Sequence, residues 1–238
     1  MNGTAAPAPW EAQHRPRRGF EPTFHAMEVL FRPPVRLWFN WRFEGLENIP
    51  FAHGPVLIAS NHVSYADPLA LAYPLYLRGY WAHYLAKSEL FKNPLLGSFL
   101  RAAGQIPVER GTGNQKPLDD ATKLLDAGDA VILFPEGTIS RSDDHTQGPS
   151  KTGIARLALS TGIAVTPMAV WGTHGFMSTG RGKNPGFGRP IWFSVGEPMS
   201  FEGSPEDGTL LREVTDEIMA RVAELTDGLR AGYPERWA

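Results

Sequence analysis

The stretch PVLIASNHVSYADPLALAYPLYL, residues 55–77, contains the pattern that sets the fold. Pro55–Ser60 is a short apolar run bounded by Gly54 and Asn61, which is typical of a buried strand. Asp67–Leu77 indicates a helix, with Pro68 in its first turn. A strand that passes through a short polar turn into a helix is the repeating unit of an α/β fold.

The same alternation continues along the chain. The clearest helix is 210–229, because apolar residues recur there at spacings of three and four. We therefore predict an α/β fold, with a mostly parallel central sheet flanked by helices. The further predicted strands are 84–86, 105–108, 130–134, 164–171 and 191–195, and the further predicted helices are 94–103, 118–127 and 152–161.

The N-terminal end has a different composition. Residues 1–22 are rich in Pro, Ala and Arg, and we predict that they are disordered or loosely attached. Residues 23–43 are apolar and aromatic, with arginines, and a Pro33-Pro34 break predicts two short helices. We interpret 23–43 as a helical membrane-docking segment on an anionic surface, followed by one α/β domain over 44–238. The alternative is that these helices cover the sheet as part of the core.

Composition excludes several classes of function. The chain has 238 residues, no cysteine and a net charge of −2, which argues against thiol catalysis, Cys-ligated zinc and nucleic-acid binding. No run approaches the roughly 20 apolar residues that a spanning helix needs, and no signal peptide is evident. The seven histidines show no metal-binding spacing, so we expect no metal.

Polar residues that could take part in catalysis or substrate binding follow the predicted strands. At the turn after 55–60, Asp67 could accept a hydrogen bond from His62 and so prepare it as a general base, or it could only cap the next helix. The strand 130–134 runs into Glu136, Gly137 and Thr138, with Arg141 close behind, and alone this is an ordinary turn. Lys87 and Arg110 follow two other strands, where either could bind a phosphate or remain a solvated charge.

The order of these motifs resembles the glycerolipid acyltransferase family, the lysophosphatidic acid acyltransferases and their relatives. That family has N-H-x4-D, G-x-I-P-V-x-R, F-P-E-G-T-R-S and V-x-P blocks. Here the corresponding segments are NHVSYAD, GQIPVER, FPEGTIS and VTPMAV, within residues 55–171. The resemblance implies that the chain transfers an acyl group from a thioester to the hydroxyl of a lysophospholipid, most simply 1-acyl-glycerol-3-phosphate.

The resemblance also implies a role for each matching residue. His62 would take the proton of the attacking hydroxyl, with Asp67 orienting it. Arg110 and Lys87, the latter in a K-x-E-L stretch, would hold the acceptor phosphate. Glu136 and Gly137 would shape the acceptor site, with Glu136 binding a hydroxyl or anchoring Arg110. The V-x-P block would help to line the acyl site.

One position departs from the family pattern. Ile139 stands where the family has an Arg after Thr138, and the next arginine is Arg141. Either Arg141 and Lys151 take over the phosphate contact, or the acceptor is another lipid, such as a mannosylated phosphoinositide or lyso-ornithine lipid. A non-catalytic lipid-binding protein and a metal hydrolase are the remaining alternatives.

The resemblance implies no cofactor, with acyl-CoA or acyl carrier protein as the acyl donor. It places the enzyme peripherally at the cytoplasmic face of the cell membrane, in contact with anionic phospholipid.

Overall fold

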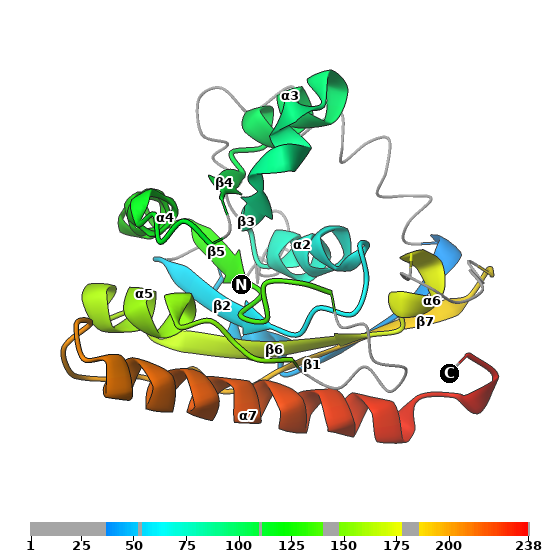
Figure 1. Cartoon of the computed structure of the whole chain (residues 1–238). Helices are drawn as coiled ribbons and strands as arrows, with labels where there is room; N and C mark the ends of the chain where they lie inside the picture. Colours follow the sequence, from blue (N-terminus) through cyan, green and yellow to red (C-terminus); the bar gives the residue numbers. More distant parts are fainter. Residues whose placement is uncertain (1–36, 52–53, 110, 140–147, 178–185, 238) are drawn as a thin grey trace, which may run out of the picture.

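The computed structural model describes residues 37–51, 54–109, 111–139, 148–177 and 186–237. They form one seven-stranded sheet in the order β1-β7-β6-β2-β5-β3-β4 (Figure 1). All neighbouring strands are parallel except β6 and β7, which are antiparallel. The predicted α/β fold with a mostly parallel sheet is therefore confirmed. The strands are β1 (Phe39–Glu44), β2 (Val56–Ser60), β3 (Ala82–Lys87), β4 (Ile106–Val108), β5 (Ala130–Leu133), β6 (Val165–Trp171) and β7 (Arg189–Val195).

Helices cover both faces of the sheet. One face packs against α4 (Lys116–Asp126), α5 (Gly153–Thr161) and α7 (Gly208–Gly232), and the other packs against α2 (Asp67–Leu77). Side chains of β2 alternate between these two layers, and all five of its residues are buried. The remaining elements are α3 (Pro94–Ala102), α6 (His174–Met177) and the 3-10 helices η1 (Leu46–Asn48), η2 (Ser88–Lys92) and η3 (Glu235–Trp237).

Local sequence signals explain where the helices begin and end. The Asp207 side chain accepts hydrogen bonds from the N–H groups of Thr209 and Leu210, at 2.9 and 3.2 Å, and so caps the start of α7. Gly162 ends α5 with a φ of 68°, a left-handed conformation that glycine adopts without strain. The predicted helix 210–229 is thus extended by two residues at its start and three at its end.

The prediction of a helical segment over residues 23–43 is wrong for residues 39–43. These residues belong to β1, which pairs in parallel with β7. The aromatic side chains of Phe39, Trp41 and Phe43 alternate along the strand and pack against the core, so the alternative of core packing holds for them. Residues 39–43 (FNWRF) alternate between aromatic and polar side chains, which suits a strand with one buried face. Pairing with β7 gives this strand its hydrogen-bonded partner. Residues 1–36 lie outside the described part of the chain.

None of the helices among the described residues is long and apolar enough to cross a bilayer.

Candidate active site

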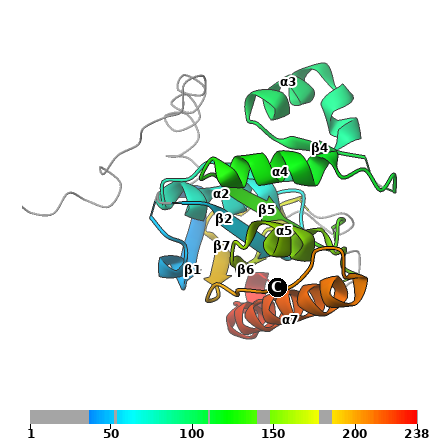
Figure 2. The ribbon, with the colours of Figure 1, turned by 90° about the vertical axis from the view of Figure 1, so that its left-hand side faces the viewer.

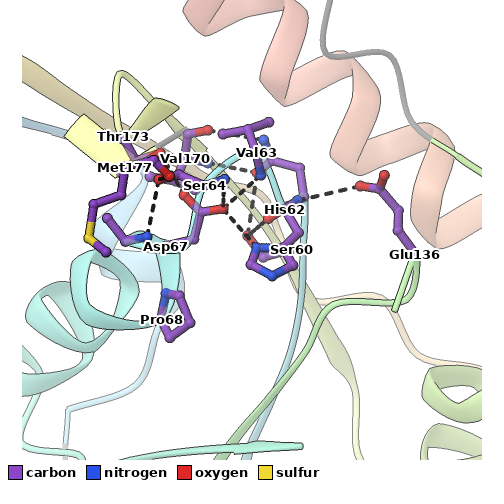
Figure 3. A network of polar contacts seen from close by, with 12 residues as sticks. Ser60, His62, Val63, Ser64, Asp67, Pro68, Glu136, Val170, Thr173 and Met177 are labelled. Atoms are coloured by element: carbon purple, nitrogen blue, oxygen red, sulfur yellow. Dashed lines mark hydrogen bonds and ion pairs between the residues drawn. The ribbon is translucent and has the colours of Figure 1, made fainter. Parts of the chain in front are cut away.

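His62 and Asp67 form a hydrogen-bonded pair at the carboxyl end of β2 (Figure 3). The distance between His62 Nδ1 and Asp67 Oδ2 is 2.9 Å, so the hydrogen bond expected from the turn is present. The same carboxylate oxygen accepts the backbone N–H groups of Val63 and Ser64, at 2.7 and 2.8 Å. Asp67 therefore folds the turn and orients the imidazole. The alternative that it only caps the next helix is wrong, because α2 begins at Asp67 and has no side-chain capping hydrogen bond.

This contact determines which imidazole nitrogen faces outward. A carboxylate only accepts hydrogen bonds, so Nδ1 of neutral His62 carries the proton and Nε2 carries the lone pair. Nε2 makes no hydrogen bond to any residue that the structure describes, and the side chain is 15% exposed. His62 is thus held in the tautomer that a general base requires.

The second carboxylate oxygen of Asp67 has a partner that the sequence analysis missed. Thr173 Oγ1 donates to Asp67 Oδ1 over 2.5 Å, and both residues are buried. Thr173 lies in the turn after β6, behind Gly172, whose φ is 98°. A Cβ at Gly172 would lie 2.2 Å from the carbonyl oxygen of Pro190, so only glycine fits there. In the sequence, Gly172 is the local signal that the turn holding Thr173 is constrained.

The strands that meet at this site are held in register by Asn61, which the sequence analysis also left without a role. Its side-chain amide donates to the Val170 carbonyl at 3.0 Å and accepts the Val170 N–H at 2.9 Å. These two bonds continue the pairing of β2 with β6 beyond its last pair, Ser60 and Met168. They bring the turn after β6, and hence Thr173, next to the turn after β2.

An aromatic wall supports the imidazole from the other side. The His62 ring stacks on Phe134 with the ring centroids 4.2 Å apart, and Tyr84 stacks on Phe134 in turn. The Tyr84 hydroxyl donates to the Pro68 carbonyl at 2.6 Å. Burial, with the charge of Asp67, holds the pKa of Tyr84 well above its usual range, so this phenol stays neutral. The imidazole of His62 is thus held by an apolar ring, Phe134, and by a carboxylate, Asp67.

Glu136, three residues beyond the end of β5, is buried and turned toward the backbone of His62 (Figure 3). Its carboxylate accepts the N–H of His62 at 3.4 Å and that of Gly148 at 3.1 Å. Burial raises the pKa of Glu136, and the two N–H donors and His62 partly offset that rise. Two carboxylates therefore bind the consecutive N–H groups of residues 62–64, which fixes the position of the base. The alternative that Glu136 anchors Arg110 is untested, because Arg110 lies outside the described residues.

The turn around Gly137 lies against the side chain of Lys151. Gly137 has a φ of 64°, and its N–H donates to the Phe134 carbonyl at 2.8 Å. A Cβ at Gly137 would meet Lys151 Cε at 3.2 Å, so the lysine stem lies over the glycine. Thr138 is exposed and Ile139 is buried, so the position of the family's arginine points into the protein.

The predicted phosphate-binding cations are only partly described. Lys87 ends β3, is exposed, and pairs with Glu89 at 3.2 Å between Nζ and Oε1. Val108, the last residue of β4, pairs with Lys87 in the sheet. Arg110 and Arg141 lie outside the described residues, so their contribution stays a prediction. Among the residues that the structure describes, no three His, Asp or Glu side chains converge as metal ligands.

Comparison with known sequences identifies relatives of this chain. A sequence model of the family described as Acyltransferase matches residues 40–171. The chloroplastic 1-acyl-sn-glycerol-3-phosphate acyltransferase of Arabidopsis thaliana is 34% identical over 145 residues, covering 60% of this chain and 39% of that protein. The 1-acyl-sn-glycerol-3-phosphate acyltransferase of Bacillus subtilis is 30% identical over 187 residues, covering 77% and 86%. This chain spans about two fifths of the length of the chloroplast relatives.

Two further similarities concern the acceptor and the fold. The lyso-ornithine lipid O-acyltransferase of Brucella abortus is 32% identical over 182 residues, covering 71% of this chain and 62% of that protein. The crystal structure of the 1-acyl-sn-glycerophosphate acyltransferase from Thermotoga maritima superposes with a TM-score of 0.60 at 25% identity, covering 91% of this chain and 85% of that chain.

Proposed function

Since the chain belongs to the acyltransferase family, we propose that it is an O-acyltransferase that moves a fatty acyl group from a thioester to the hydroxyl of a lysophospholipid. The proposed acceptor is 1-acyl-glycerol-3-phosphate, and the product is then phosphatidic acid. The observation that carries this proposal is the His62–Asp67 pair, because a binding protein has no need of an oriented general base.

The proposed reaction is a direct transfer. Nε2 of His62 takes the proton of the acceptor hydroxyl as its oxygen attacks the thioester carbonyl. Asp67 stabilises the imidazolium that forms, and the proton then neutralises the departing thiolate. A new C–O bond replaces the C–S bond. The chain has no cysteine and no G-x-S-x-G elbow to carry a covalent acyl intermediate, which favours this direct route.

The donor is acyl-CoA or the acyl thioester of acyl carrier protein, and no cofactor takes part. Lys87 and Arg110 are the proposed phosphate contacts of the acceptor. Thr138 and Arg141, which follow Gly137 in the chain, are further candidates for binding the substrate. The carboxylate of Glu136 already binds two backbone N–H groups, which favours a positioning role over direct contact with substrate. The enzyme acts peripherally at the cytoplasmic face of the membrane, where its acceptor resides.

A second acceptor class is favoured by one position. Ile139 is buried where the family pattern has an arginine. An apolar residue cannot bind a phosphate, so an acceptor without a phosphomonoester, such as a lyso-ornithine lipid, fits this site as well. The similarity to an enzyme named for that acceptor supports this alternative.

One experiment separates these acceptors. The purified full chain is given radiolabelled acyl-CoA with a panel containing 1-acyl-glycerol-3-phosphate, lysophosphatidylethanolamine, lysophosphatidylglycerol and lyso-ornithine lipid, and the products are resolved by chromatography. Label in phosphatidic acid supports the main proposal. Label only in ornithine lipid moves the proposal to the second acceptor. Label released only as free fatty acid would make the protein a thioesterase.

A further inference from the structure

Large apolar side chains that are exposed to solvent gather at one edge of the sheet. In the part of the chain that the structure describes there are ten of them. All ten lie on segments that leave the sheet at the carboxyl ends of β2, β3 and β6, or that enter β1 and β7 beside those ends. The ten are Leu37, Trp38, Tyr65, Leu69, Leu90, Leu95, Leu96, Phe99, Met177 and Phe187.

This edge is also the one that carries the His62–Asp67 pair. The strands β2, β6, β5, β3 and β4 are parallel, so their carboxyl ends meet along one side of the sheet. The chain begins β7 where β6 ends, and β1 runs parallel to β7, so both begin at this side. Exposed single apolar residues are ordinary on a protein surface, but their confinement to the edge of the active site is not.

The densest group lies on η2 and α3, and we call it the α3 apolar face: Leu90, Leu95, Leu96 and Phe99. The only buried residue of α3 is Gly97, where a Cβ would lie 2.2 Å from the Phe91 carbonyl oxygen. The helix thus packs on η2 through its glycine and leaves the leucines outside, with Leu95 85% exposed. Figures 1 and 2 both show α3 standing apart from the sheet, at the end of the molecule opposite α7.

The charge around the α3 apolar face is basic. Lys87, Lys92 and Arg101 are exposed on this segment, against one acid, Glu89. The exposed side of α7 carries five acids and three arginines, and a further four acids precede it at residues 197–207. A basic, apolar end opposite an acidic end orients a protein on an anionic surface.

From these observations we propose that the α3 apolar face docks the enzyme on an anionic phospholipid bilayer, with the active-site edge facing the lipid. The proposal rests on the proposed function, because a lysophospholipid presents its hydroxyl at the headgroup boundary. The leucines and Phe99 enter that boundary while Lys92 and Arg101 contact lipid phosphates. This surface is distinct from the predicted docking segment at residues 23–43.

The absence of cysteine from the chain makes a direct test possible. In the full chain, Leu95→Cys introduces a single thiol for an environment-sensitive fluorophore, and Ala220→Cys, on the exposed side of α7, is the matched control. On addition of vesicles of phosphatidylcholine and phosphatidylglycerol, the probe at residue 95 should shift its emission to the blue, and the probe at residue 220 should not. Pure phosphatidylcholine vesicles should give a smaller shift, because the basic residues then lack their partners.

Two results with the labelled protein would overturn the proposal. A probe at residue 95 that is already in an apolar environment before vesicles are added, and is unchanged by them, would show that the chain itself covers this face. A blue shift that depends on protein concentration in the absence of lipid would make a second copy of the chain the occupant.

A second pair of variants keeps binding and catalysis separate. Leu95→Glu and Phe99→Glu should each weaken cosedimentation with the anionic vesicles by about tenfold, and Ala220→Glu should leave it unchanged. Both Glu variants should lose turnover on a vesicle-borne acceptor but keep it on a soluble short-chain acceptor. Undiminished cosedimentation of Leu95→Glu would refute the docking surface. A wild type that binds vesicles but transfers no acyl group would refute the proposed function and leave the docking surface intact.

Discussion

Replacing Thr173 by valine tests how the site holds its general base. Thr173 donates the only hydrogen bond that Asp67 Oδ1 receives among the described residues, over 2.5 Å in a buried setting. Valine has almost the same shape, so the variant opens no cavity, and its effect comes from the lost hydroxyl, which leaves Oδ1 of the buried carboxylate without that donor. The carboxylate then keeps its three contacts through Oδ2 but loses the one that prevents its rotation.

The size of the effect follows from the charge on the acceptor atom. A hydrogen bond to a charged group contributes about 1.5–3 kcal/mol net, and 1.4 kcal/mol corresponds to a factor of ten. We therefore expect kcat of Thr173→Val to fall by about 10- to 100-fold with little change in either KM, because Asp67 acts on the imidazolium of the transition state. The free energy of unfolding should fall by about 1.5–3 kcal/mol, which leaves an ordinary domain folded.

The assay follows the thiol of released CoA with a thiol-reactive chromophore, and no cysteine of the chain interferes. Thr173→Ser, which keeps the hydroxyl, should restore most of kcat. Thr215→Val is the control, because Thr215 is equally buried but donates to the Leu211 carbonyl within α7, away from the site. Wild-type kcat in a folded Thr173→Val variant, or a loss that Thr173→Ser shares in full, would refute the positioning role.

Three further outcomes are expected. His62→Ala should lose about 10²- to 10⁴-fold in turnover while its unfolding transition persists, and full activity in this variant would remove the general base from the mechanism. Arg110→Ala should raise the acceptor KM far more than the donor KM, and the opposite split would assign Arg110 to the phosphates of CoA. Burial raises the pKa of Glu136 above its ordinary 4.5. Between pH 4.5 and the folded-state pKa, the folded chain therefore binds more protons than the unfolded chain. Its contribution to stability is thus greatest below pH 4.5 and falls as pH rises through the folded-state pKa. The free energy of unfolding, measured with denaturant across this pH range, should decline in the wild type but not in Glu136→Gln. If the two proteins show the same dependence on pH, the prediction is contradicted.

Several features of this protein are readable from the sequence alone. The α/β class, the run 55–60 as a buried strand and the long helix near 210–229 follow from apolar periodicity, which local burial imposes on each element separately. The His62–Asp67 contact is also local, since five residues at a strand end span one turn. Where an apolar segment is compatible with both a helix and a strand, as residues 39–43 are, the sequence does not decide between the two structures.

The tertiary structure decided the contacts that join distant strands. Thr173 meets Asp67 across 106 residues, and Glu136 meets the N–H of His62 across 74, because β6 and β5 lie on either side of β2. Strand order arises from the packing of the whole sheet, and no spacing along the chain encodes it. For the same reason, the gathering of apolar residues from η2, α3 and the strand ends at the edge of the active site is visible only in the folded molecule.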